Sequence, residues 1–453
     1  MGVVSDELRS SKKAMSDVFT NIAMRRVFAA FGGSLIGDGV FALSAIVFAY
    51  RHGGPTAVGG LAVVRYVAIA STAPFTSTLA DRYDRRNVMV VSDMVRLVLV
   101  SAAAVLAGLH ASKWYIFLLV VLVGIAGTAF RPAQASIIPL LARRNDEIAG
   151  ANVVSSTIES VGFFAGPALA GFLLAFANVP IAFAFDALTF VWSALFVMSV
   201  RYPTKRSPDL DTVSNNGAMP EDDQAESFLS RAAQGFHVIS GNHDVRTLVI
   251  LYILQCVVAG ASAVFTVAIA LQMLHIGSSG LGLMESTIGI GGLIGGFIAL
   301  MLVERARLAT NFGLGVMVWA APLILIAAFP SLAAAFIAMW LIGAANSLVD
   351  VNAITVLQHV VPNEKLGRVL GALEAGEVAG MALGSLAMTV LIHVTGLRDG
   401  LALIGGIVTL AVLPGLPTMK RIDREVFSEG VVHRPKSAHG HLHFHNFRLR
   451  HTR

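Results

Sequence analysis

Several ionisable side chains lie inside long apolar stretches of this sequence, where charge is costly and therefore suggests a function. Asp38, Arg65 and Glu159 fall in the first half of the chain, and Glu374 and Glu377 fall in the second. At the centre of a bilayer such a side chain costs about 2.5–3.5 kcal/mol on insertion scales. Because residues of this kind mark ion and substrate pathways, we expect these five to carry a proton or to contact a substrate. Other apolar stretches hold Asp186, Glu285 and Asp350, whereas three residues nearer the stretch ends are expected to form structural pairs: Asp93, Arg96 and Arg131.

Asp38 and Arg65 lie in consecutive apolar stretches and predict an ion pair. Burial favours the neutral form of a carboxyl group, whereas a nearby arginine favours the charged form. If the arginine moves, the carboxyl group can take up a proton in one state and release it in another. We therefore predict Asp38, tuned by Arg65, as the main proton site, with Glu159 and Glu377 lining the cavity. Static hydrogen bonds between helices are the alternative role for each carboxylate.

The overall composition indicates a membrane environment. Of 453 residues, 55% are hydrophobic and only 13% are charged, and the mean hydropathy is +0.73, whereas soluble domains carry about 25% charged residues. This balance excludes an ordinary soluble enzyme and a disordered protein. The single cysteine, Cys256, excludes a disulfide framework. Neither zinc-type ligand spacing nor a phosphate-binding loop occurs, so we expect no metal, no cofactor, no nucleic-acid partner and no direct use of ATP.

The apolar stretches are long enough to cross a bilayer as helices, which requires about 20 residues each. They do not alternate apolar with polar residues, as the strands of a membrane β-barrel would. The sequence therefore predicts an all-α membrane protein with twelve transmembrane helices, near residues 27–50, 57–80, 88–109, 113–138, 148–176, 179–201, 246–274, 279–303, 312–330, 332–359, 366–395 and 398–418.

A polar segment divides these helices into two sets of six. We predict five parts: a cytoplasmic N-terminal segment (1–26), an N-terminal six-helix bundle (27–202), a linker (203–245), a C-terminal six-helix bundle (246–418) and a basic, His-rich tail (419–453). Apolar residues at helical spacing over 227–239 predict a short amphipathic helix in the linker, lying on the membrane surface. For the tail we expect a solvated segment near anionic lipid rather than a metal sensor.

Basic residues predict the orientation, since cytoplasmic loops are enriched in Lys and Arg. The loops after the second, fourth, eighth and tenth helices hold Arg82, Arg85, Arg86, Arg143, Arg144, Arg305, Arg307, Lys365 and Arg368. The opposite loops hold only Arg51, Lys113 and Arg398. Both termini and the linker are therefore predicted to be cytoplasmic, in the inner (plasma) membrane.

The two halves resemble each other at a shift of 218 residues. Glu159-x-x-Gly162-x-x-x-Gly166 in the fifth predicted helix aligns with Glu377-x-x-Gly380-x-x-x-Gly384 in the eleventh. Matching positions in the two sets of six predict two bundles related by a parallel repeat. Transporters with this layout place the substrate between the bundles, near the middle of the membrane.

Two local motifs resemble those of the major facilitator superfamily, in particular its bacterial drug and siderophore exporters of the drug:proton antiporter type. The first is the loop Ala80-Asp81-Arg82-Tyr83-Asp84-Arg85-Arg86, which matches the family's loop between helices two and three except for Ser77 and Asp84 at its two glycines. The second is the set Gly162, Gly166, Pro167 and Gly171, which resembles the antiporter motif of the fifth helix. The resemblance implies that Asp81, with Arg82, Arg85 and Arg86, locks the cytoplasmic side, and that transport is export.

Together these features predict a secondary active transporter that exports a hydrophobic or amphipathic small molecule by alternating access. Protons are the expected coupling ion, the lipid bilayer is the expected surroundings, and a monomer is the expected state. The alternatives are uptake or lipid flipping on the same fold and, from another class, a membrane sensor that transports nothing.

Overall fold

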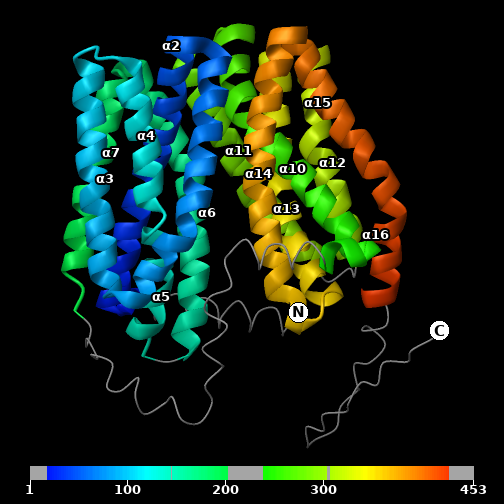
Figure 1. Ribbon diagram of the computed structural model, residues 1–453, viewed down its shortest axis with the longest axis horizontal. Helices are drawn as coiled ribbons and strands as arrows, with labels where there is room; N and C mark the ends of the chain where they lie inside the picture. Colours follow the sequence, from blue (N-terminus) through cyan, green and yellow to red (C-terminus); the bar gives the residue numbers. More distant parts are fainter. Residues whose placement is uncertain (1–17, 144, 202–237, 304–306, 428–453) are drawn as a thin grey trace, which may run out of the picture.

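The structure is a computed structural model that describes residues 18–143, 145–201, 238–303 and 307–427. It consists of helices, without strands in the described part, and the long helices run side by side (Figure 1). The linker helix predicted over 227–239 lies almost entirely outside the described residues, as do most of segment 1–26 and the His-rich tail from 428 onward.

Among the described residues, the first half contains these helices in chain order: α2 (Ile22–Arg82), α3 (Arg85–Gly108), α4 (Lys113–Gly127), α5 (Phe130–Leu141), α6 (Asn145–Phe176) and α7 (Val179–Met198). The second half begins with α10 (His243–Ala268) and continues through a π-helical turn (Ile269–Met273), α11 (Gly277–Val303), α12 (Leu308–Ala328), α13 (Leu332–Val360), α14 (Asn363–Thr395), α15 (Leu397–Val412), a 3-10 turn (Leu413–Gly415), α16 (Leu416–Ile422) and a final π-helical turn (Asp423–Phe427).

Eleven of the described helical segments are long and apolar enough to cross a membrane, and the first of them accounts for two crossings. Helix α2 bends at Gly53 and Gly54, and Gly54 has a φ of 60° and a ψ of −156°, which only glycine adopts readily. Its two arms, 22–52 and 55–82, are about 46 Å and about 42 Å long at 1.5 Å per residue, and both exceed the ~30 Å hydrocarbon core. Counted by arms, the chain crosses twelve times, and the predicted all-α, twelve-helix fold is confirmed.

The helix contacts follow the predicted repeat. Within the halves, α2 packs on α6 as α10 packs on α14, and α3 packs on α7 as α12 packs on α15. Between the halves, α6 contacts α11, and α14 contacts α2. The predicted repeat relates the second crossing (the second arm of α2) to the eighth (α11), and the fifth (α6) to the eleventh (α14). It therefore converts the contact between α6 and α11 into the contact between α14 and α2. The structure therefore consists of two six-helix bundles in a parallel repeat.

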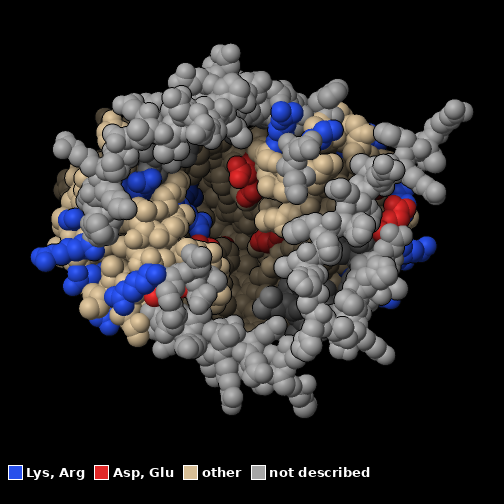
Figure 2. Space-filling model, turned by 90° about the horizontal axis from the view of Figure 1, so that it is seen from below, with Lys and Arg blue, Asp and Glu red and all other residues tan. Residues whose placement is uncertain are grey.

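The two faces of the membrane domain differ. We call the face with the bend of α2 the bend face (top of Figure 1), and the face where α7 ends and α10 begins the linker face. At the bend face, hydrogen bonds join the halves: the Tyr50 hydroxyl donates to Gln272 Oε1 (3.2 Å) and Arg51 donates to Ser278 Oγ (3.3 Å). At the linker face the molecule is hollowed between the halves, and acidic side chains lie in the hollow (Figure 2). The structure is thus hollowed toward the linker face and joined by hydrogen bonds between its halves at the bend face.

Candidate functional site

A cavity of about 440 Å³ lies between the two halves. The N-terminal half contributes a side of α6, and the C-terminal half contributes the wall formed by α10 to α14. The lining is mainly apolar with a few polar groups, which is typical of small-molecule sites. Its polar and aromatic members are Glu159, Ser160, Phe163, Ser262, Phe265, Glu285, Trp319, Asn346 and Ser347.

Glu159 lines this cavity and forms an ion pair with Arg131. Both side chains are accessible, with 40% of Glu159 and 62% of Arg131 exposed. Arg131 lies at the start of α5, just after the interruption between α4 and α5 at Thr128 and Ala129. The pair bridges the fourth and fifth crossings beside the central cavity.

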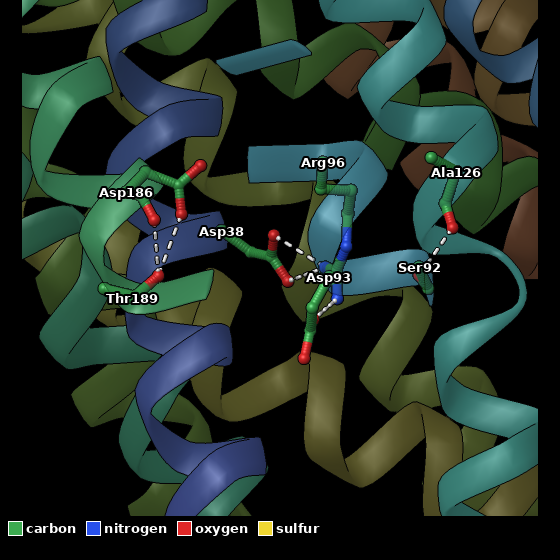
Figure 3. A network of polar contacts seen from close by, with 7 residues as sticks. All are labelled: Asp38, Ser92, Asp93, Arg96, Ala126, Asp186 and Thr189. Atoms are coloured by element: carbon green, nitrogen blue, oxygen red, sulfur yellow. Dashed lines mark hydrogen bonds and ion pairs between the residues drawn. The ribbon is translucent and has the colours of Figure 1, made fainter. Parts of the chain in front are cut away.

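A second cavity, of about 410 Å³, lies within the N-terminal half and contains Asp38, Arg65, Arg96 and Arg131. Asp38 does not form its ion pair with Arg65, as the sequence suggested, but with Arg96 of α3, at 3.3 Å (Figure 3). Arg65 reaches the same cavity, where its charge faces Asp38 without an ion pair among the described residues. Spacing along the chain does not show how α3 is rotated relative to the first arm of α2. That rotation determines which arginine contacts Asp38.

Arg96 is a buried cation shared by two carboxylates. Its second guanidinium nitrogen donates to Asp93 Oδ1 at 2.6 Å, and both Arg96 and Asp93 are almost fully buried. The guanidinium also lies over the rings of Phe130 (5.0 Å) and Phe190 (4.3 Å). Asp38, in contrast, is 42% exposed toward the cavity. Asp93 and the two rings therefore fix Arg96, while Asp38 is the partner that water can reach.

Asp186 of α7 lies beside the first arm of α2 and close to this network (Figure 3). It is fully buried and accepts a hydrogen bond from Thr189 Oγ1 at 3.2 Å. A side chain at Gly37 would collide with both Thr189 and Asp186. Glycine at position 37 thus allows α7 to approach the helix that carries Asp38.

The C-terminal half contains a polar network that the sequence did not reveal. Asn346 Oδ1 accepts from Gln255 Nε2 (3.0 Å) and from Trp319 Nε1 (3.1 Å), and Asn346 Nδ2 donates to Asp350 (2.9 Å). Amides and indoles carry no charge, so a hydropathy pattern gives only a weak signal for such residues. Asn346 joins α10, α12 and α13 at the cavity wall.

Glu377 and Glu374 of α14 lie beside this network. The Tyr252 hydroxyl donates to Glu377 Oε2 at 3.5 Å, and the charge of Asp350 also faces Glu377. Glu374 is exposed and lies near Glu377. Neither glutamate is among the residues that line the central cavity, so the structure does not place Glu377 there as the sequence predicted. Among the described residues, no cation pairs with either of them.

Glu285 of α11 is the acidic residue of the C-terminal half that lines the central cavity directly. Thr266 is its hydrogen-bonding neighbour, and Tyr66 from the N-terminal half faces it. No ion pair joins Glu285 to a described residue, so its carboxyl group is available to a ligand or a proton. Its position in an apolar stretch was the signal that could have placed it among the predicted site residues.

The predicted glycine motif of α6 forms close helix contacts on two sides. Leu35 covers Gly162, and a Cβ on Gly166 would lie 2.9 Å from Gly39 Cα in the first arm of α2. One turn beyond Pro167, a Cβ on Gly171 would lie 2.9 Å from Gly282 Cα in α11. The motif therefore packs α6 against its own half and, near the bend face, against the other half.

The predicted gating loop is described only in part. The side chains of Asp81 and Arg82, at the end of α2, lie outside the described part of the chain. Asp84, which replaces a glycine of the family motif, caps α3 by accepting from Asn87 N at 3.0 Å. Arg86 donates to the Met198 carbonyl at 2.8 Å and so ties α3 to the end of α7. Arg85 lies in the same first turn of α3. Among the described residues, no group of three or more potential ligands is arranged to hold a metal.

Comparisons with known proteins agree with these features. The sequence matches the Major Facilitator Superfamily over residues 27–302 and again over 251–443. It is 24% identical over 334 residues to a Bacillus subtilis (strain 168) protein named for bacilysin export, covering 73% of this chain and 79% of that one. It is also 24% identical over 151 residues to macrolide efflux protein A of Enterococcus faecalis, covering 33% of this chain and only 46% of the relative. The crystal structure of the nucleoside transporter NupG has the same fold, with a TM-score of 0.69 at 12% identity, over 88% of this chain and 99% of that one.

Proposed function

Because this chain belongs to the Major Facilitator Superfamily, a family of membrane transporters rather than enzymes, we propose that it exports a hydrophobic or amphipathic small molecule by proton-coupled alternating access. The observation that carries the proposal is the cavity between the two halves, closed at the bend face and open at the linker face. The names of the relatives, macrolide efflux protein and bacilysin exporter, support export as the direction.

In this proposal the linker face is the cytoplasmic face, as the basic loops predict. The cavity takes its substrate from the cytoplasm or the inner leaflet. Phe163, which is 58% exposed, offers apolar contact area, and Glu159 and Glu285 offer charge. Substrates are thus recognised mainly by apolar surface and, where they carry one, by a positive charge.

The proposed proton site is Asp38. Protonation removes its attraction to Arg96, but Arg96 keeps Asp93 and its two aromatic neighbours. The network therefore has two arrangements that differ by one proton, as a coupling switch requires. Arg65, in the same cavity, is the cation that can replace the proton when the helices move.

Close contacts at glycine residues can transmit a movement of the helix that carries Asp38 to the bend face. The helix that carries Asp38 contacts α6 through Gly39 and Gly166, and α6 contacts the other half through Gly171 and Gly282. Because backbones touch directly at both places, a tilt of the first arm of α2 must move α6. That movement separates or joins the halves at the bend face.

The test is transport in proteoliposomes with radiolabelled erythromycin, a macrolide, and tetraphenylphosphonium, a lipophilic cation. Acidifying the lumen should drive accumulation through the copies oriented linker face outward, and a protonophore should abolish it. Cells that express the protein should retain less of both compounds. Higher retention in these cells would instead indicate uptake, and equal retention of every compound tested would contradict export.

A further inference from the structure

A groove of about 530 Å³ lies on the outside of the N-terminal half, between the second arm of α2 and α4. It is separate from both cavities described above and faces the surrounding lipid, since Val64 and Leu118 on its walls are 55% and 56% exposed. Its lining is apolar except at one end, and comprises Gly53, Thr56, Ala57, Gly60, Leu61, Val64, Lys113, Trp114, Phe117, Leu118 and Val121.

The groove has the length of one leaflet. Along α4 it extends from Lys113 to Val121, about 12 Å at 1.5 Å per residue, and along α2 from Gly53 to Val64, about 16 Å. Half of the ~30 Å hydrocarbon core is about 15 Å. Both walls begin at the bend face, so the groove runs from the membrane surface toward its middle, as an acyl chain does.

The polar end of the groove is cationic. Lys113 Nζ donates one hydrogen bond, to the His52 carbonyl at 2.8 Å, which leaves two of its three donors for a ligand. The chain segments at this rim, 50–57 and 108–118, contain Arg51, His52 and His110 but no acidic residue. Trp114, 69% exposed, stands at the depth where interfacial tryptophans are enriched.

The apolar floor of the groove is rigid. Phe117 packs edge-on against Trp114 (5.9 Å between ring centroids) and against Phe48 (6.1 Å). Gly60 leaves the space above the floor empty, since a Cβ there would meet no atom within 4 Å. The groove is thus a preformed slot with a cation at its mouth.

We propose that this groove binds an anionic glycerophospholipid, with its phosphate on Lys113 and one acyl chain along Gly60 and Phe117. This site is independent of the transported substrate. The arm of α2 that forms the groove also contacts the other half, where Thr56 Oγ1 lies 3.4 Å from His393 Nε2 and Thr389 lies against Gly59. The bound lipid therefore supports the arm that closes the bend face.

The test measures lipid binding by the purified full-length protein, by native mass spectrometry and by the shift in melting temperature on adding lipid. The probes are phosphatidylglycerol, phosphatidylcholine and inorganic phosphate. Lys113→Ala removes the cation, and Gly60→Phe fills the groove. Gly406→Phe on α15 is the matched control, because its Cβ also meets no atom within 4 Å.

We expect the wild-type protein and Gly406→Phe to retain one tightly bound phosphatidylglycerol. Lys113→Ala and Gly60→Phe should each weaken this binding about tenfold, a factor that corresponds to about 1.4 kcal/mol. Equal binding by all four proteins would overturn the proposal. So would equal retention of phosphatidylcholine, or an equal melting shift with inorganic phosphate. Lys113→Ala lies at the surface, so its result stands even if Gly60→Phe fails to fold.

Discussion

Replacing Asp38 by asparagine should separate proton coupling from folding. The side chain borders the cavity of the N-terminal half and contacts Arg96 at 3.3 Å, and asparagine keeps its size and an accepting oxygen for Arg96. Arg96 retains Asp93 at 2.6 Å and the faces of Phe130 and Phe190, so no buried charge is left unpaired. Asp38→Asn should therefore fold with nearly wild-type stability.

Asp93→Asn is the matched comparison. Asp93 is fully buried and holds the same arginine, and breaking a buried pair by removing one partner costs about 3–5 kcal/mol. The two substitutions remove the same charge from the same network, but only the second should lower the melting temperature strongly.

The assay compares two kinds of transport in proteoliposomes. Accumulation driven by a proton gradient should fall at least about tenfold in Asp38→Asn, a factor that corresponds to about 1.4 kcal/mol. Exchange of labelled for unlabelled substrate, without a gradient, should continue, because it requires the cavity but no net proton movement.

Two results would refute this reasoning. Gradient-driven accumulation within twofold of wild type would remove Asp38 from the coupling step. A loss of stability as large as that of Asp93→Asn would mean that Asp38 is a structural partner of Arg96, and the transport defect would then say nothing about protons.

Three further predictions follow from other contacts. Glu285→Gln should weaken tetraphenylphosphonium binding about tenfold while leaving a neutral substrate unaffected, because the carboxylate lines the cavity without a described cation; equal losses for both ligands would contradict this role. Gly171→Leu should push α6 away from α11 at the bend face. In a protein lacking Cys256, it should raise the rate at which an impermeant maleimide labels Ser278→Cys. The control Gly406→Leu, in open space, should leave this rate unchanged. Arg131→Glu should reduce transport with less than about 1 kcal/mol loss of stability, and adding Glu159→Arg should restore it; no rescue would show that the ion pair itself is not what transport requires.

The fold could be predicted because its strongest signals are local. Apolar runs long enough for a bilayer give the twelve crossings, including the two that form the arms of α2. The glycine motif of α6 was also visible, since close helix approach requires small residues at fixed spacing. In these cases one element of the chain contains the whole signal.

Partner choice could not be predicted, because it depends on how whole helices rotate and tilt. Asp38 had two arginines within reach on neighbouring helices, and only packing places Arg96, rather than Arg65, at 3.3 Å. Asn346 is a similar case, since its partners Gln255 and Trp319 come from two other helices. The same holds for the Arg131–Glu159 pair, whose partners lie on two different helices, α5 and α6.

The repeat relates the two halves in shape but not in chemistry. In the N-terminal half, the charges of Asp38, Asp93 and Glu159 are all paired with arginines. In the C-terminal half, α11, α12 and α13 contain no Lys or Arg; Glu285 meets neutral polar groups, and Asp350 meets Asn346 and the like charge of Glu377. Paired charges can exchange partners when a proton arrives, whereas unpaired carboxylates attract a ligand that supplies the missing charge. This asymmetry is the physical reason for assigning the proton switch to the first bundle and substrate recognition to the second.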